Sequence, residues 1–122
     1  MAKYNCEVFG LISYSLEISY HDLYEVEETL MADLQEVLEN LGGVHLDFWG
    51  YGDTLQLQCC FSEFDLDTLG AVCRDMAAKL PRDVNGKLVC VDKHLRNLQV
   101  YYLGEGQCQG VSLDIAEPPN MK

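Results

Sequence analysis

The sequence predicts an α+β domain in which two amphipathic helices cover one face of an antiparallel sheet. Three observations support this fold class. Apolar and polar residues alternate in several short segments, which is typical of half-buried strands. Two longer segments repeat their apolar residues at helical spacing. Finally, a chain of 122 residues that is 48% hydrophobic fits a single domain with its own core.

The first predicted element is a strand over residues 4–20, where apolar and polar residues alternate. One face of this strand carries apolar side chains such as Val8. Gly10 lies in the same register and indicates a bend or a bulge. Phe9 and Leu11 interrupt the pattern, because they place apolar side chains on the otherwise polar face.

An amphipathic helix is predicted over residues 22–41. Asp22 is its expected N-cap, with Glu25 three residues later as in a capping box. The pair Gly42-Gly43 ends the helix. The remaining predicted elements are strands over residues 44–49, 54–61, 87–91, 98–103 and 111–115, and a second helix over residues 65–80.

The order of these elements is a strand, a helix, two strands, a helix and a strand, followed by a β-hairpin. The first six elements match the split β-α-β pattern of a ferredoxin-like (βαββαβ) sheet, and the hairpin is a C-terminal extension. Residues 1–115 are expected to form one α+β domain, and residues 116–122 a flexible tail. This fold supports many unrelated activities and so implies none.

A zinc site is one candidate within the hairpin over residues 44–61. His45, Asp47 and Cys60 share its outward face, and zinc accepts all three ligand types. Two registers keep the apolar faces inward, and only the one with a two-residue loop brings His45 opposite Cys60. Because a fourth ligand is missing in both registers, we predict no metal and no cofactor.

The six cysteines show no C-x-x-C spacing, and most lie within apolar patterns. This is typical of reduced thiols in the cytoplasm. The sequence shows neither an apolar run long enough to cross a membrane nor a secretory signal. No catalytic residue is predicted: Cys60 lies among acids, where a thiolate is disfavoured. A thiol or zinc enzyme is the minor alternative.

The charge distribution is the most unusual property of the chain. The net charge is −12, from 20 acidic and 8 basic residues. Residues 4–73 contain 14 acids and no Lys or Arg, so this interval carries −14. Direct binding of nucleic acid is disfavoured, because no basic stripe would neutralise the phosphates. A basic protein surface is the favoured partner.

The predicted first helix concentrates this charge. At 100° per residue, Glu25, Glu28, Glu36 and Glu39 fall within an arc of about 80°, opposite the apolar stripe, and Asp33 lies between them in sequence. Acids from Asp22 to Glu39 give roughly one charge per 3.6 Å of helix axis, against about one per 3.4 Å along a DNA strand. A solvated face that only keeps the protein soluble is the other interpretation.

The outward face of the sheet is the second candidate surface. Trp49 and Tyr51, with Phe9 and Leu11, could form an apolar patch rimmed by acids, which is typical of an interface. The acids closest in sequence are Asp47 and Asp53. Three alternatives stay open: the C-terminal hairpin covers this patch, a partner binds it, or a second copy of the chain binds it.

The sequence thus predicts a small acidic protein whose anionic surface occupies a basic nucleic-acid-binding groove of a partner. In this it resembles, as a class, small phage- or mobile-element-encoded inhibitors, the anti-CRISPR and anti-restriction proteins among them. The alternative is a dimeric small-molecule-binding or regulatory domain that uses the open sheet face.

Overall fold

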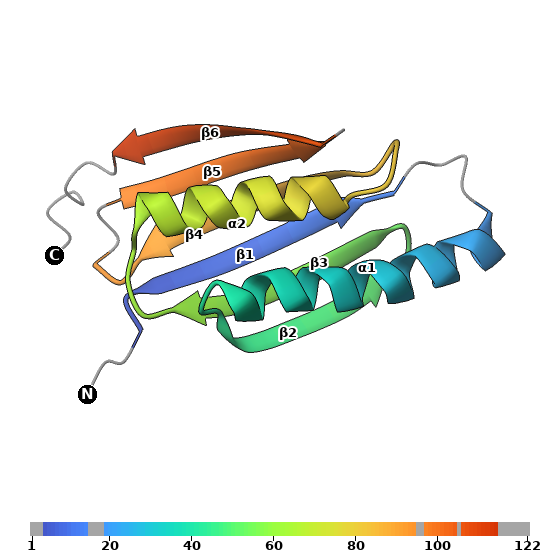
Figure 1. Ribbon diagram of the computed structural model, residues 1–122, viewed down its shortest axis with the longest axis horizontal. Coiled ribbons are helices and arrows are strands. Elements are labelled where there is room, and N and C mark those ends of the chain that lie inside the picture. The colour runs from blue at the N-terminus through green and yellow to red at the C-terminus, as the bar shows by residue number, and fades with distance from the viewer. Residues whose placement is uncertain (1–3, 15–18, 95–96, 105, 115–122) are drawn as a thin grey trace, which may run out of the picture.

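The computed structural model describes residues 4–14, 19–94, 97–104 and 106–114. Within these ranges the chain forms two helices and six strands (Figure 1). In chain order they are β1 (Cys6–Ser13), α1 (Tyr20–Asn40), β2 (Val44–Tyr51), β3 (Thr54–Phe61), α2 (Leu66–Lys79), β4 (Asn85–Asp92), β5 (Asn97–Gly104) and β6 (Gln107–Asp114). The α+β class predicted from the sequence is confirmed.

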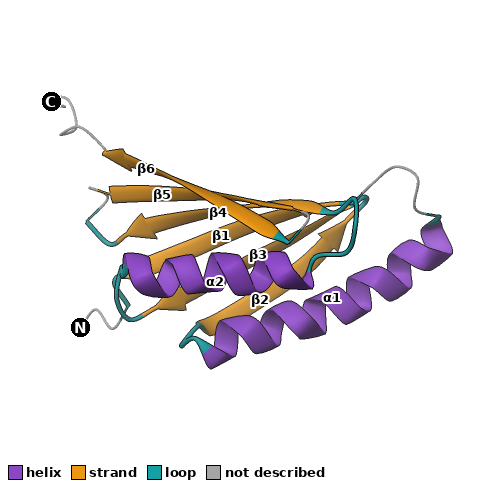
Figure 2. Cartoon of the chain, turned by 45° about the horizontal axis from the view of Figure 1, so that its top comes forward, coloured by secondary structure: helices purple, strands orange, loops and turns teal. Residues whose placement is uncertain are grey.

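The six strands form one antiparallel sheet in the order β2-β3-β1-β4-β5-β6. Both helices lie on the same face of this sheet (Figures 1 and 2). β5 and β6 extend the sheet beyond β4, so the arrangement is not a plain ferredoxin-like βαββαβ sheet. In the described part of the chain, no helix covers the opposite face.

The hydrophobic core lies between the sheet and the helix layer. On β1, Val8 and Ile12 are fully buried, whereas Phe9 and Leu11, which point to the opposite face, are exposed. Leu30 and Leu34 of α1 and Met76 of α2 belong to the same buried cluster. Burying one large apolar side chain contributes roughly 1.5–3 kcal/mol, so these layers hold the helices on the sheet. The period-two prediction is confirmed over β1.

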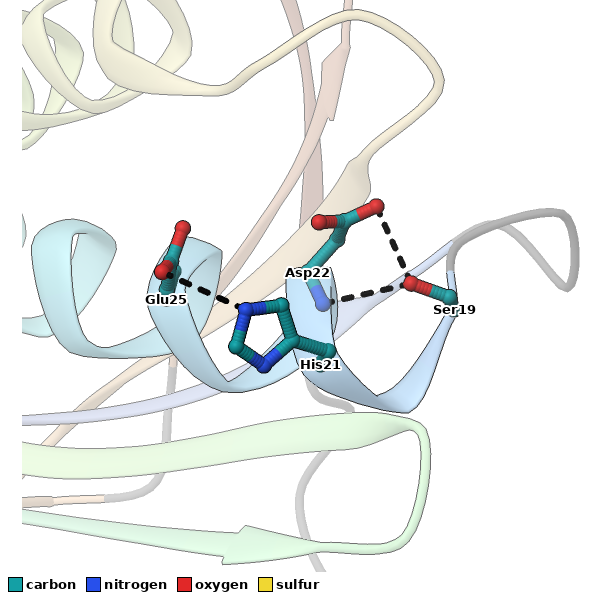
Figure 3. A network of polar contacts seen from close by, with 4 residues as sticks. All are labelled: Ser19, His21, Asp22 and Glu25. Atoms are coloured by element: carbon teal, nitrogen blue, oxygen red, sulfur yellow. Dashed lines mark hydrogen bonds and ion pairs between the residues drawn. The ribbon is translucent and has the colours of Figure 1, made fainter.

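The start of α1 differs from the prediction. The expected strand over residues 4–20 is too long, because β1 ends at Ser13 and α1 begins at Tyr20; residues 15–18 lie outside the described ranges. Ser19, and not Asp22, is the N-cap. Its Oγ accepts a hydrogen bond from the Asp22 backbone N–H at 3.3 Å and donates one to Asp22 Oδ2 at 3.0 Å (Figure 3). Asp22 thus occupies the position three residues after the N-cap that the prediction gave to Glu25.

The end of α1 is where the sequence predicted it. Leu41 is the C-cap, and Gly42 follows with φ +98°. The Gly43 N–H donates to the Leu38 carbonyl at 2.7 Å, and the Gly42 N–H donates to the Glu39 carbonyl at 3.1 Å. This is a Schellman motif, in which a left-handed glycine reverses the chain and satisfies the last carbonyls.

Gly10 marks neither a bend nor a bulge. The register of β1 runs without interruption against both β3 and β4. Instead, a Cβ at residue 10 would lie 2.6 Å from Leu57 Cγ on the neighbouring strand. The missing side chain therefore makes room for Leu57, which is buried in the core.

The β2–β3 hairpin has the two-residue loop. Tyr51 pairs with Thr54, and Gly52 has φ +63° at the first loop position, as a type II′ turn requires. Farther from the turn, a β-bulge between Val44 and Asp47 adds one residue to β2. Because of it Val44, and not His45, pairs with Cys60.

The C-terminal hairpin joins the edge of the sheet. β5 pairs with β4, and β6 pairs with β5 over its whole length. Residues 104–110, which separate the two strands predicted for this hairpin, are mostly strand, since β6 already begins at Gln107. The predicted tail, residues 116–122, lies outside the described residues.

The N-cap assignment makes a testable prediction. Ser19→Ala should lower the free energy of unfolding by about 1 kcal/mol, because the Asp22 N–H loses its acceptor. Urea unfolding followed by circular dichroism measures this. Ser62→Ala removes an exposed loop hydroxyl and should change stability by less than about 0.5 kcal/mol. Equal effects of both changes would contradict the assignment.

Two glycine substitutions should have opposite effects. Gly10→Ala should destabilise the fold by about 1–3 kcal/mol, because its Cβ collides with buried Leu57. Gly70→Ala should stabilise it by about 0.5–1 kcal/mol, because residue 70 is helical and its Cβ would meet only the flexible Arg74 side chain, at 3.3 Å. Thermal unfolding of both variants tests the pair, and a neutral Gly10→Ala would count against the packing argument.

Candidate functional site

The acidic face of α1 is the first candidate surface. It is formed by Glu25, Glu28, Glu36 and Glu39, and all four side chains are exposed. They lie on the side of the helix opposite Leu30, which is buried. The helix packs on the sheet through its leucines, so the four carboxylates point away from the core.

Among the described residues the acidic face is not neutralised by ion pairs with Lys or Arg, although Lys79 lines a groove that Glu25 also lines. One ion-pair contact is present: His21 Nε2 lies 3.8 Å from Glu25 Oε1, with both side chains largely exposed (Figure 3). This contact is attractive only when His21 is protonated.

The helix carries this charge at some cost in stability. Glu25 and Glu28 are three residues apart, as are Glu36 and Glu39, and such like-charge pairs repel by a few tenths of a kcal/mol. The last turn contains no basic residue, so Glu39 also opposes the helix dipole. One local contact helps to hold it: Gln35 Nε2 donates to Glu39 Oε1 at 2.7 Å.

Asp33 lies beside the acidic face and not on it. It is half-buried and lines a groove of about 300 Å³ between α1 and the end of α2. Lys79 and Pro81 line the same groove, so a base is present on its far side. A second groove, of about 460 Å³, lies over the ends of β4, β5 and β6. The predicted alternative, a dimeric small-molecule-binding or regulatory domain, uses the open sheet face and stays a prediction.

Glu27 points toward the sheet. A Cβ at Gly50 of β2 would collide with the Glu27 carboxylate, so the glycine makes room for it. The buried hydroxyl of Tyr14 is nearby and has no hydrogen-bond partner among the described residues. Burial raises the pKa of Tyr14, and the negative charge of Glu27 raises it further. Glu27 therefore belongs to the α1–β2 contact and not to the acidic face.

The open sheet face is the second candidate surface. We use this name for the outward side chains of the six strands. Large apolar side chains are exposed there: Phe9 40%, Leu11 42%, Trp49 40%, Tyr102 48% and Val111 41%. The C-terminal hairpin extends the sheet edge to edge and does not fold across this face. The predicted alternative that this hairpin covers the patch is wrong.

The outward residues of β2 lie at one edge of the open sheet face. Asp47 pairs with Gln58, Trp49 with Gln56 and Tyr51 with Thr54. Tyr51 is 77% exposed, and Asp53 is exposed in the turn that follows.

The structure therefore divides the predicted site residues between two surfaces. Glu25, Glu28, Glu36 and Glu39 lie on the outer side of the helix layer. Asp47, Trp49 and Tyr51 belong to the opposite side of the sheet. A single flat partner surface cannot contact both groups, because the core separates them.

Two apolar residues of the open sheet face were not predicted from the sequence. Val89 of β4 and Val100 of β5 are half-buried there, in one row with Phe9 and Val111. The signal was the continuous apolar run Leu88–Val91, since a strand that is apolar on both faces does not alternate.

The hairpin cysteines have separate environments. Cys59 is fully buried and Cys60 is half-buried on the opposite face of β3, as predicted. Burial raises the pKa of Cys60, which opposes a role as a nucleophile. His45 lies at the bulge, with its ring 5.1 Å from that of Tyr4. Among the residues that the structure describes, no three His, Cys, Asp or Glu side chains form a metal-binding cluster.

Comparison with known proteins identifies no relative: no protein-family model matches the chain, and no curated protein matches its sequence. Within the described ranges, neither helix combines the length and the apolar character that a membrane span needs. The site must therefore be interpreted from its own chemistry.

The buried thiols predict how stability depends on pH. Burial raises the pKa of Cys59 from 9.0 to about 12, so between these values the unfolded chain releases a proton that the folded chain keeps. Stability should be complete below pH 9 and fall as pH rises toward 12, with Cys59 contributing about 1.4 kcal/mol per pH unit. Urea unfolding at pH 8–11 measures the slope.

Cys59→Ala should make this slope shallower by that amount. Val8→Ala is the matched control, because it truncates a buried neighbour without removing a thiol. It should lower stability at every pH and leave the slope unchanged. An unchanged slope in Cys59→Ala would contradict the assignment.

Proposed function

We propose that the protein is an acidic interaction protein whose α1 surface occupies a basic, nucleic-acid-binding groove on a partner protein. The observation that carries this proposal is the acidic face, four exposed carboxylates with no Lys or Arg paired to them in the described residues. An unneutralised surface of one sign attracts the opposite sign and accelerates association.

The negative electrostatic field of α1 supports the proposal, whereas the spacing of its charges does not match that of DNA phosphates. Of the acids between Asp22 and Glu39, Glu27 and Asp33 are half-buried. The exposed ones give about one charge per 5 Å of helix axis, which is sparser than the roughly 3.4 Å of a DNA strand. The partner groove is therefore expected to recognise a line of negative charge and not individual phosphate positions.

The destabilising placement of Glu36 and Glu39 also supports the proposal. Glu39 opposes the helix dipole and is repelled by Glu36, although neutral polar residues would keep the helix soluble.

We also propose that the protein is cytoplasmic and belongs to the class of phage-encoded inhibitors. We further propose that β1–β4 and the two helices form a ferredoxin-like unit within the larger sheet. The strand order β2-β3-β1-β4 within the sheet supports this unit.

Removing the charge of the acidic face tests the function. The variant with Glu25, Glu28, Glu36 and Glu39 all changed to Gln keeps the helix formers and removes four charges. The immobilised protein should capture basic nucleic-acid-binding proteins from a cell extract at 50 mM salt, and a DNA duplex should release them. Each exposed charge pair contributes modestly, so the variant should bind roughly 10- to 100-fold more weakly.

The matched control removes the same number of charges elsewhere. Glu63→Gln, Asp67→Asn, Asp75→Asn and Asp83→Asn change exposed acids outside α1 and give the same net charge. This control should bind as the native protein does, and binding should weaken with added salt in both. If the control and the α1 variant lose binding equally, net charge and not the acidic face is responsible. If neither loses binding, the proposal is wrong.

A further inference from the structure

We propose that the open sheet face binds a second copy of the chain, so that two sheets pack face to face with both acidic helices turned outward. This inference does not depend on the proposed function, because it concerns the opposite side of the molecule.

The apolar part of the open sheet face is continuous. Phe9 pairs with Val89, Val89 with Val100 and Val100 with Val111, so one row of four apolar residues crosses four adjacent strands. We call this the central row. Phe9 and Val111 are about two-fifths exposed. A contiguous row of partly exposed apolar side chains is typical of an interaction site.

The size of the face fits a dimer. Six strands about 4.8 Å apart, each of eight residues with a rise of about 3.3 Å, give a face of roughly 700 Å². Two copies would bury roughly 1,400 Å² in total, within the range of about 1,200–2,000 Å² for stable interfaces.

The charge of the face also permits a second copy. The charged side chains among its outward strand residues are Glu7, Asp47 and Lys87. Their net charge is −1, whereas the whole chain carries −12. Two copies can therefore meet here with little repulsion, while their acidic faces stay on opposite sides of the dimer. A basic partner would be drawn to the helix layer instead.

The charges on the two sides of the central row are complementary. The pair Leu11–Lys87 lies on one side of Phe9–Val89, and the pair Glu7–Val91 on the other. A twofold axis along the central row exchanges these sides. It places Lys87 opposite Val91 of the second copy, beside Glu7 of that copy on the adjacent strand.

Two further features agree with this arrangement. β1 and β4 are the two central strands, so the angle of about 30° between packed sheets displaces the Lys87–Glu7 contact little. Within its own chain, Lys87 Nζ lies 5.1 Å from the centre of the Tyr102 ring, which keeps the ammonium over the face. Asp47 lies in the row of Phe9, because both residues pair with Gln58, so the axis brings the two Asp47 side chains of the dimer near each other. They lie on edge strand β2, at the solvent rim, where their repulsion is screened.

Analytical ultracentrifugation of the full chain from 1 to 200 μM tests the dimer. We expect twice the monomer mass of 13.8 kDa at the upper concentrations. Phe9→Asp places an unpaired charge on the axis and should raise the dissociation constant roughly 30- to 4,000-fold. Leu66→Asp is the control, since Leu66 is 52% exposed on α2 and should leave the constant unchanged within about threefold.

A charge exchange tests the twofold arrangement itself. Lys87→Glu and Glu7→Lys should each weaken the dimer roughly tenfold, and the double variant should restore it to within about threefold. Circular dichroism shows that each variant is folded. A folded native chain that is monomeric at 200 μM would overturn the proposal, as would a dimer that Phe9→Asp leaves intact. Failure of the double variant to recover would overturn the proposed axis.

The two proposals fail separately. The α1 variant with four Gln substitutions should dimerise as the native chain does, because its changes lie on the far side of the core. A monomeric Phe9→Asp variant should still present its acidic face to a basic partner. Loss of dimerisation in the four-Gln variant would contradict the separation of the two surfaces.

Discussion

The alternation of side chains along β1 is the constraint on which the rest of the structure depends. β1 pairs with β3 on one side and with β4 on the other, so its register fixes both neighbours. Because the side-chain period of a strand is two, Val8 and Ile12 must face the helices while Phe9 and Leu11 must face away. A slip of one residue would exchange these sets and expose the core. The same rule that builds the core therefore also leaves two large apolar side chains in solvent.

The acidic surface depends on packing that occurs on the other side of the same helix. Leu30, Leu34 and Leu38 are almost completely buried, and each contributes roughly 1.5–3 kcal/mol. The repulsion among the glutamates is a few tenths of a kcal/mol per pair. Since the first quantity is several times larger, α1 can tolerate an unneutralised face without losing its place on the sheet. The leucines that stabilise α1 and the glutamates that carry its charge therefore lie on opposite sides of the same helix.

The sequence predicted much of the fold, because the fold is largely determined by local patterns. The helical stripe of α1, its end at Gly42 and the strands of the hairpin follow from spacing and turn chemistry. The N-cap was assigned wrongly, because Ser19 and Asp22 are both good caps, and a local pattern does not rank them. The bulge at His45 was also missed, since an inserted residue is defined by the partner strand and not by its own sequence.

The candidate surfaces were predicted less completely, because the exposure of a side chain also depends on elements that are distant in sequence. The exposure of the four glutamates follows from helical geometry alone, whereas Asp33 is half-buried because α2 happens to pack beside it. Whether Trp49 and Phe9 were covered depended on where the hairpin of β5 and β6, far along the chain, would pair. Only the strand order decides that question, because β5 prefers the free edge of β4 to the open face.

The bulge in β2 limits how this sheet can grow. An edge strand with free backbone groups is a template for another strand, and a sheet with two such edges can extend without end. In β2 the extra residue near His45 interrupts the regular spacing of those groups, and Asp47 adds a charge. In β6 the pairing runs without a bulge over the whole strand, so that edge offers the longer regular template. Strand addition is therefore expected first at the β6 edge, and two chains joined there leave only the bulged and charged β2 edges to continue the sheet.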